Sequence, residues 1–260
     1  MAVVNAESNV VNLESNNEWT EAKINARLLE LGLTMEQIDY LNWESKLEIA
    51  KEDTATEVLS FNRTTHSFNE NNNSFIKPMS LTDDIALNIV AINMGNSGGH
   101  PYLKVVADYD WSSMPFYRLN DAFAITWSEG WYGNSWGFTE QQKYCVTDGS
   151  GCGSYTWSKS SIATARDQDR LAGVGWLYDL KGGSLDAKGT AYVYLIGNDE
   201  ATIKSTTYSA FKAWYGHDKA SSNIGISIGY GSAGVSAGVD FGGEEYTTDS
   251  TSIKNSTLTY

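Results

Sequence analysis

The feature that most constrains the fold is a switch in hydrophobic period along the chain. Between residues 18 and 52 the apolar residues recur at helical spacing, so that Ile24, Leu28 and Leu31 share one helix face. In the later part of the chain apolar and polar residues alternate, as they do between Leu103 and Trp111. Alternation places every second side chain on the same face of a strand. The switch therefore predicts a short helical segment followed by a β-rich body.

Local signals divide the helical segment into three helices. Gly32 stands where a left-handed C-cap belongs, Thr34 with Gln37 forms a capping-box pattern, and Asn42 can cap a further helix. We therefore expect a small three-helix N-terminal module. The expected boundaries are a disordered tail at 1–17, the helical module at 18–52, a linker or irregular loop at 53–80 and a β domain at 81–260.

The later part of the chain has the composition of a β protein with many turns. Only three prolines occur, against 24 glycines, and several alternating segments each carry one apolar face. Strands of this kind bury their apolar face against a second sheet. The sequence predicts a mainly β fold, with an antiparallel β-sandwich body of roughly eight to ten strands.

Charge and hydropathy argue against several classes of partner. The formal net charge is −14, and no basic stripe is present, so a nucleic-acid partner is disfavoured. No apolar run approaches the roughly 20 residues of a membrane-spanning helix, so no stable membrane span is expected. The pattern contains no indication of the oligomeric state.

The two cysteines and the first residues favour an extracellular protein. Cys145 and Cys152 bracket an Asp148-Gly149 turn, and two cysteines across a hairpin lie within reach of a disulfide. A reduced pair is the alternative. The Val4–Ala6 segment is similar to the end of a signal peptide that has been removed, although an ordinary polar tail would read the same way. We expect a secreted protein.

The segment Gly95-Asn-Ser-Gly-Gly99 is similar to the nucleophile motif of a serine protease, but the sequence distances to the other triad residues are too short. Together with His66 and Asp84, Ser97 would complete the order of a trypsin-like triad, but the gaps are only 18 and 13 residues. Two barrels cannot form within such gaps, and a triad is defined by geometry. We therefore predict that this segment is a hairpin loop and that Ser97 is not a nucleophile.

No cofactor, metal or catalytic residue is assigned from the sequence. His100 and His217 are isolated, and no metal-ligand spacing or phosphate-binding loop is found. Asp108 and Asp110 share a strand face, and Asp121 and Glu129 follow nearby. Such carboxylates fit a glycosidase site, a calcium site or the solvated face of an edge strand.

The segment from Trp127 to Trp136 is the candidate ligand-binding loop. Its rings belong to Trp127, Trp131, Tyr132 and Trp136, and they stand among Gly, Asn and Ser residues. Flat rings beside polar groups suit stacking on sugar rings or insertion at a membrane interface. Rings that fold back to cap the end of the sandwich are the structural alternative.

A hairpin near the C-terminus has bulky residues on one face and Gly or Ser on the other. The bulky residues are Ile224, Ile226, Ile228, Val235, Val239 and Phe241. This pattern resembles the membrane hairpins of β-pore-forming toxins, but each arm is at or below the 9–11 residues of a bilayer strand. An ordinary sandwich strand explains the pattern equally well.

Two stretches resemble uncharacterised secreted proteins of Gram-positive spore-formers. They are the helical stretch from Leu28 to Leu41, and the pattern of Tyr109-Asp110-Trp111, Pro115, Arg118, Asp121 and Trp127. The resemblance implies a short helical segment before a β-rich body, and it implies secretion. It implies no activity.

The combined expectation is a secreted, non-enzymatic protein that binds a surface ligand through the Trp127–Trp136 loop. A polysaccharide or cell-surface glycan is the expected ligand class, because such rings can stack on sugar rings. The alternatives are a pore-forming or membrane-active protein that uses the 224–241 hairpin, and a glycoside hydrolase.

Overall fold

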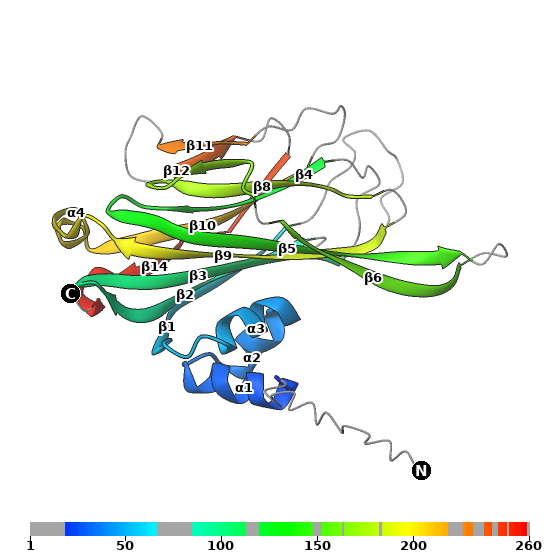
Figure 1. The fold of residues 1–260 in the computed structure, drawn as a ribbon, viewed down its shortest axis with the longest axis horizontal. Coiled ribbons are helices and arrows are strands. Elements are labelled where there is room, and N and C mark those ends of the chain that lie inside the picture. The colour runs from blue at the N-terminus through cyan, green and yellow to red at the C-terminus, as the bar shows by residue number, and fades with distance from the viewer. Residues whose placement is uncertain are drawn as a thin grey trace, which may run out of the picture.

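The computed structural model describes residues 19–66, 85–112, 120–147, 152–162, 164–181, 184–217, 226–230, 237–240, 244–248 and 250–258. Over these ranges the protein is mainly β, with two six-stranded sheets, one two-stranded sheet and four α-helices. All strand pairs are antiparallel. Figure 1 shows the two large sheets as stacked layers, with helices below the lower sheet.

Three helices form where the caps predict them. They are α1 (Glu21–Glu30), α2 (Met35–Tyr40) and α3 (Trp43–Ala50). Thr34 and Gln37 form both bonds of the capping box, and the Asn42 side chain accepts a hydrogen bond from Ser45 N. Gly32 has a φ of 99°, the left-handed conformation expected after α1.

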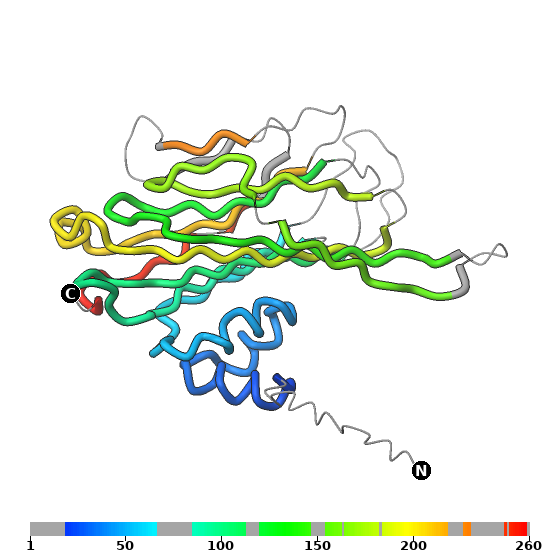
Figure 2. The backbone as a smooth tube through the Cα atoms, in the orientation of Figure 1, coloured from blue at the N-terminus to red at the C-terminus, as the bar shows by residue number. Residues whose placement is uncertain are grey.

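The first sheet carries the longest strands. Its order is β1-β2-β3-β9-β5-β6. The bounds are β1 (Glu57–His66), β2 (Ile85–Ser97), β3 (His100–Trp111), β9 (Ser184–Gly197), β5 (Trp131–Thr147) and β6 (Cys152–Ile162). β5 and β9 are distant in sequence but run side by side, as the tube in Figure 2 shows.

The second sheet is built mainly from later strands. Its order is β13-β10-β4-β8-β7, and β14 also pairs with β10. The bounds are β4 (Asn120–Trp127), β7 (Asp167–Asp169), β8 (Gly173–Asp179), β10 (Tyr208–His217), β13 (Glu244–Thr247) and β14 (Thr251–Lys254). The remaining elements are α4 (Glu200–Ser205), the pair β11 (Ser227–Tyr230) and β12 (Ala237–Asp240), and a 3₁₀ turn (Asn255–Thr257).

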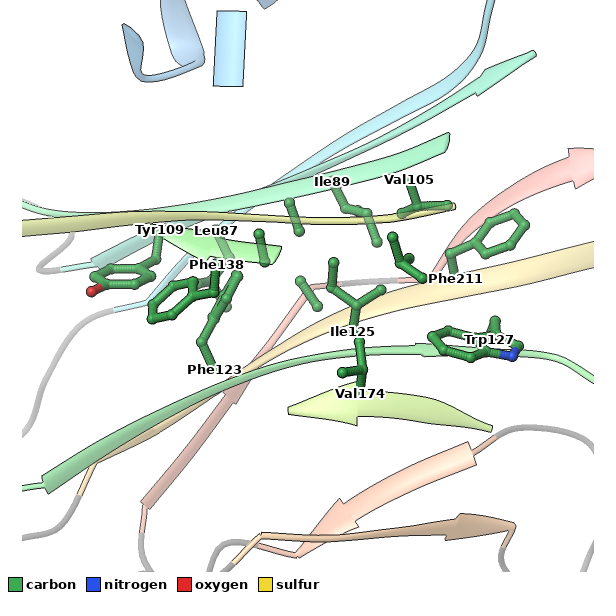
Figure 3. Packing of buried hydrophobic residues seen from close by; sticks show 14 of the residues in the cluster. Leu87, Ile89, Val105, Tyr109, Phe123, Ile125, Trp127, Phe138, Val174 and Phe211 are labelled. Carbon is green, nitrogen blue, oxygen red and sulfur yellow. The ribbon is translucent and has the colours of Figure 1, made fainter. Parts of the chain in front are cut away.

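The main hydrophobic core lies between the two large sheets. The first sheet contributes Leu87, Ile89, Val105, Tyr109 and Phe138, and the second contributes Phe123, Ile125, Trp127, Val174 and Phe211. Figure 3 shows these side chains meeting between the two layers. The fourteen strands in the described ranges exceed the roughly eight to ten expected, because strands of three or four residues are too short to show a period.

The helices are not a separate module, because they share a second core with the outer face of the first sheet. Ile24, Leu28 and Ile49 pack in one cluster with Ile92 and Val106 of that sheet. The face of the sheet that looks away from the second sheet is therefore covered over part of its area by α1–α3.

A buried lysine adds a polar attachment between α3 and the sheet. Lys104 is fully buried on the outer face of β3. Its Nζ donates to Glu48 O at 2.8 Å, Glu48 Oε2 at 3.0 Å and Glu52 Oε1 at 2.6 Å. The ammonium also lies 4.8 Å from the centre of the Tyr192 ring and 4.9 Å from that of Tyr194. All three N–H donors of the lysine thus have partners on α3 or just after it.

The prediction of a linker or irregular loop at 53–80 is wrong over part of its length. Residues Glu57–His66 form β1, which pairs with β2 along its length apart from one bulge. The polar run Asn-Arg-Thr-Thr-His reads as a loop, but an edge strand needs only main-chain pairing on one side. Residues 67–80 and the predicted tail at 1–17 lie outside the described ranges.

Candidate functional site

Two of the four predicted ligand-binding rings belong to the core. Trp127 ends β4 and Trp131 begins β5, and their side chains are 1 % and 0 % exposed. Trp131 Nε1 donates to Ser209 Oγ at 2.8 Å. The expectation of an exposed stacking surface is wrong for both residues, because they end and begin strands of opposite sheets and face the space between them.

The other two predicted rings lie against the guanidinium group of an exposed arginine of the same chain. Tyr132 and Trp136 are half-buried, and the Arg170 guanidinium lies 5.4 Å and 4.8 Å from their ring centres. Arg170 Nη1 also donates to Gly133 O at 2.8 Å and to Asn134 O at 3.2 Å. These contacts join β5 to the turn between β7 and β8, so the two rings connect the sheets.

The four acidic residues singled out from the sequence do not converge. Asp121 lies on the second sheet, fully buried, and accepts hydrogen bonds from Tyr215 Oη and from His217 Nδ1, the latter at 2.8 Å. Glu129 is exposed in the turn before β5. Asp108 and Asp110 lie on the outer face of β3, so no common site contains all four residues.

Asp108 is a structural anchor for the helices. Its carboxylate accepts hydrogen bonds from Asn88 Nδ2 at 2.6 Å and from Asn42 N at 3.3 Å. Burial raises its pKa to about 6, against the lowering effect of hydrogen bonds from Ser45, Asn88 and Asn42. The residue therefore fixes the junction of α2 and α3 on the sheet.

A different set of residues forms the best candidate site, which we call the outer platform. It lies on the outer face of the first sheet, on the strands β6, β5, β9 and β3. Its members are Asp110, Lys143, Tyr155, Trp157, Asp186 and Lys188. Trp157 pairs with Lys143, Lys143 with Asp186, and Lys188 with Asp110, and directly paired residues share a face.

Two exposed rings define this platform. Tyr155 is 60 % exposed and Trp157 is 41 % exposed. Because they are two residues apart on one strand, their side chains leave the same face about 7 Å apart. Lys143 Nζ lies 5.5 Å from the centre of the Tyr155 ring, and Lys188 Nζ lies 4.5 Å from that of Trp157. The lysines hold the rings against the sheet.

Two carboxyl groups lie on the same face of the sheet, Asp186 two strands away from the rings of β6 and Asp110 three strands away. Burial, and then the charge of Asp186, raises the pKa of Asp110 to about 6, while the Lys188 charge lowers it. Burial also raises the pKa of Asp186, while the charges of Lys188 and Lys143 lower it. Asp186 Oδ1 is buried and accepts no hydrogen bond from the described residues. Below its surface the platform therefore carries a carboxylate oxygen that has no hydrogen-bond partner among the described residues.

The start of α3 borders the platform. Glu44 Oε1 accepts a hydrogen bond from Gln141 Nε2 at 3.1 Å, and Glu44 Oε2 lies 2.6 Å from Lys159 Nζ. Trp43, the first residue of α3, is exposed. The helices thus reach across β5 to β6 and fix the position of the platform strands.

The sequence did contain a signal for this surface. Tyr155, Trp157 and Lys159 alternate with Ser or Thr from residue 154 to residue 160. Alternation shows that these side chains share a face. It does not show that the face is uncovered, which depends on the second layer of the fold.

Cys145 is disulfide-bonded, and no described cysteine is free. Cys152 is the only other cysteine of the chain. It belongs to β6, but its side chain is outside the described part, so the Cys145–Cys152 bond stays a prediction.

The described part of the C-terminal hairpin is packed on the second sheet. β11 and β12 have four residues each, and Ile226 and Ile228 pack against Ala122 and Ala124 of β4. Ile228 N donates to Asp167 Oδ2 at 2.9 Å. Positions 224, 235 and 241 lie outside the described ranges, as does the side chain at 239. In the described residues no helix is long and apolar enough to cross a membrane.

The protease reading of Ser97 has no support in the geometry. His66 pairs with Ile85 at the start of β2, whereas Ser97 ends that strand. The two residues are therefore separated by the length of a strand, about 40 Å. The described residues also contain no group of three His, Cys, Asp or Glu side chains that could hold a metal ion.

Comparisons with known proteins do not define a family. No protein-family model and no curated protein matches the chain. A solved structure described as "pH-induced modulation of Streptococcus parasanguinis adhesion by Fap1 fimbriae" is 10% identical, with a TM-score of 0.29, over 74% of this chain and 88% of that chain. The enzymatically active domain of the bacteriophage CBA120 tailspike protein 4 is 8% identical, with a TM-score of 0.18, over 53% of this chain and 18% of that chain. Scores this low carry no argument about function.

Proposed function

We propose that this chain is a secreted, non-enzymatic protein with a β-sandwich body, and that it binds a surface glycan through the outer platform. The observation that carries the proposal is the pair of exposed rings, Tyr155 and Trp157, on one face of β6. We therefore assign glycan binding to the rings of β6 and no longer to Trp127 and Trp131, because these two residues belong to the core.

The chemistry of the platform suits a sugar chain. Flat aromatic rings stack on the apolar faces of sugar rings, and the polar tips of such side chains remain in water. Lys143 and Lys188, whose ammonium groups lie over the Trp157 ring, provide hydrogen-bond donors for hydroxyl groups. Rings about 7 Å apart on a strand can contact successive units of one polymer. Loops and surfaces supported by a rigid sheet are common places for recognition.

The test is a glycan array probed with the full chain and with Tyr155→Ala and Trp157→Ala. Each substitution is expected to weaken binding by about 1–3 kcal/mol, as loss of a stacking ring does for nucleic-acid bases. The melting temperature should change little, because both rings are exposed. Tyr208→Ala is the matched control, since Tyr208 is 55% exposed on the second sheet.

Binding that survives both platform substitutions, or that Tyr208→Ala weakens equally, would contradict the assignment of the site. A chain that retains no glycan of the array, at concentrations where weak lectins bind, would contradict the proposed function itself.

A glycoside hydrolase is the second candidate, favoured by one observation. Asp110 has a raised pKa of about 6 and lies diagonally across from Asp186 on the same face of the sheet. A carboxylic acid that keeps its proton near neutral pH can act as a general acid. Release of reducing ends from a bound glycan, abolished by Asp110→Asn, would favour this candidate over simple binding.

A further inference from the structure

β6 is the edge strand of the first sheet, and from Tyr155 to Ile162 no second strand pairs with its outer side among the described residues. It is the last strand of the first sheet and pairs with β5 alone. From the pair Phe138–Ile162 to the pair Val146–Ser154 the register is uninterrupted. A long, regular edge presents a row of N–H and C=O groups that can pair with another strand. Figure 1 shows the β5–β6 hairpin extending beyond the rest of the body.

The opposite edge of the same sheet differs from β6. β1 contains a bulge between Val58 and Ser60 and is half-buried from Val58 to His66. Bulges and coverage are the devices by which proteins protect edges from pairing. Along β6 the residues from 154 to 157 are exposed. The single charged side chain of β6, Lys159, is 2.6 Å from Glu44 of its own chain.

We propose that two copies of this chain associate through β6, antiparallel and edge to edge, with Trp157 of each copy opposite Trp157 of the other. Trp157 is the middle residue of Cys152–Ile162, so this register pairs the whole strand with its copy. It thus forms the largest number of main-chain hydrogen bonds that this edge allows.

The side chains are compatible with this register. Tyr155 falls opposite Lys159 of the second copy, a ring and an ammonium that attract one another. Thr156 falls opposite Ser158, and hydroxyl pairs of this kind are favourable across strands. A register centred on Lys159 would instead place two ammonium groups opposite each other, which is unfavourable.

The arrangement joins the two molecules into one continuous sheet. A two-fold axis perpendicular to the sheet relates antiparallel neighbours, so the outer faces of the two copies lie on the same side. The two outer platforms then adjoin, with Trp157 of each copy at the junction. The association does not depend on the proposed glycan binding.

Sedimentation of the full chain over a range of concentrations tests the proposal, with a monomer–dimer equilibrium as the expected result. Thr156→Lys together with Ser158→Lys places lysines opposite lysines in the dimer and should yield monomers. Thr156→Lys together with Ser158→Glu places opposite charges across the same edge and should restore the dimer. Both variants change the same two exposed or half-exposed positions, which makes them matched controls.

A second measurement covers the case in which the charged variants fail to fold. Trp157→Cys should be joined to its copy by a short bismaleimide, whereas Tyr208→Cys, which has no opposed copy, should not. A wild-type chain that is monomeric throughout and does not cross-link at position 157 would overturn the proposal. A dimer that is unaffected by the lysine pair would overturn the assignment to β6, and failure of the Lys–Glu variant to dimerise while folded would overturn the register.

Discussion

Acidification from about pH 7 to about pH 5 is expected to stabilise this protein through Asp108. The carboxyl group is buried among Asn42, Ser45 and Asn88, and its pKa is raised from 3.8 to about 6 in the folded state. The folded state therefore binds the proton more tightly than the unfolded state does. A raised carboxyl pKa adds stability as the pH falls through 6, and the gain is complete below 3.8.

The magnitude follows from the two pKa values. A difference of roughly two pKa units corresponds to about 3 kcal/mol between the fully ionised and the fully protonated limits. Between pH 7 and pH 5 only part of this is realised, about 1 kcal/mol. Asp110, whose pKa is also about 6, acts in the same direction. Glu52 acts in the opposite direction but below this pH range, because its pKa is lowered from 4.5 and its contribution is lost only as the pH falls below that value.

The variant Asp108→Asn isolates the contribution of the charge. It should remove most of the pH dependence between pH 7 and pH 5. It should also cost about 1–3 kcal/mol, because the amide nitrogen would face a donor, Asn88 Nδ2 or Asn42 N, in place of an acceptor oxygen. Urea denaturation at several pH values measures both effects. Asp39→Asn, at an exposed position of α2, is the control.

Two results would refute this reasoning. One is a wild-type stability that falls steadily from pH 7 to pH 5. The other is an Asp108→Asn variant that retains the full pH slope of the wild type, since the slope would then come from other groups.

Three further outcomes are expected. Lys104→Met leaves Glu52 without its buried counter-ion and should lower the free energy of unfolding by about 3–5 kcal/mol, as measured by denaturation. An unchanged free energy of unfolding would mean that apolar contacts alone attach α3 to the sheet. The intact chain should lose two hydrogens by mass relative to the reduced chain, from a Cys145–Cys152 bond, whereas a free thiol count of two would exclude the bond. A fluorophosphonate probe should not label Ser97. Labelling of the wild type that is absent in Ser97→Ala would instead support the serine-protease hypothesis.

The helix ends were predictable because their signals are local. The capping box of Thr34 and Gln37 and the cap at Asn42 join residues three apart. Bonds of this range depend little on the rest of the fold. What could not be foreseen is that Asn42 also bonds Asp108 and Gly189, residues distant in sequence. Those bonds make the helices part of the body.

The alternation of apolar and polar residues in the strands was also recognisable in the sequence. It shows only which side chains share one face of a strand. Trp131 and Tyr155 both stand among small polar residues, although only Tyr155 belongs to a segment that alternates. Trp131 is buried because its side of β5 meets the second sheet, where Phe211 and Ser209 surround it. Tyr155 is exposed because neither face of β6 is covered at this point, and Ser154 and Thr156 on the opposite face are exposed as well.

The sequence by itself thus determined the helices, the β-rich character of the body and the residues that share each strand face. Only the tertiary structure decided which faces are covered, because burial depends on contacts between segments far apart in the chain. For this reason the rings of the Trp127–Trp131 turn became core and those of β6 became the candidate site.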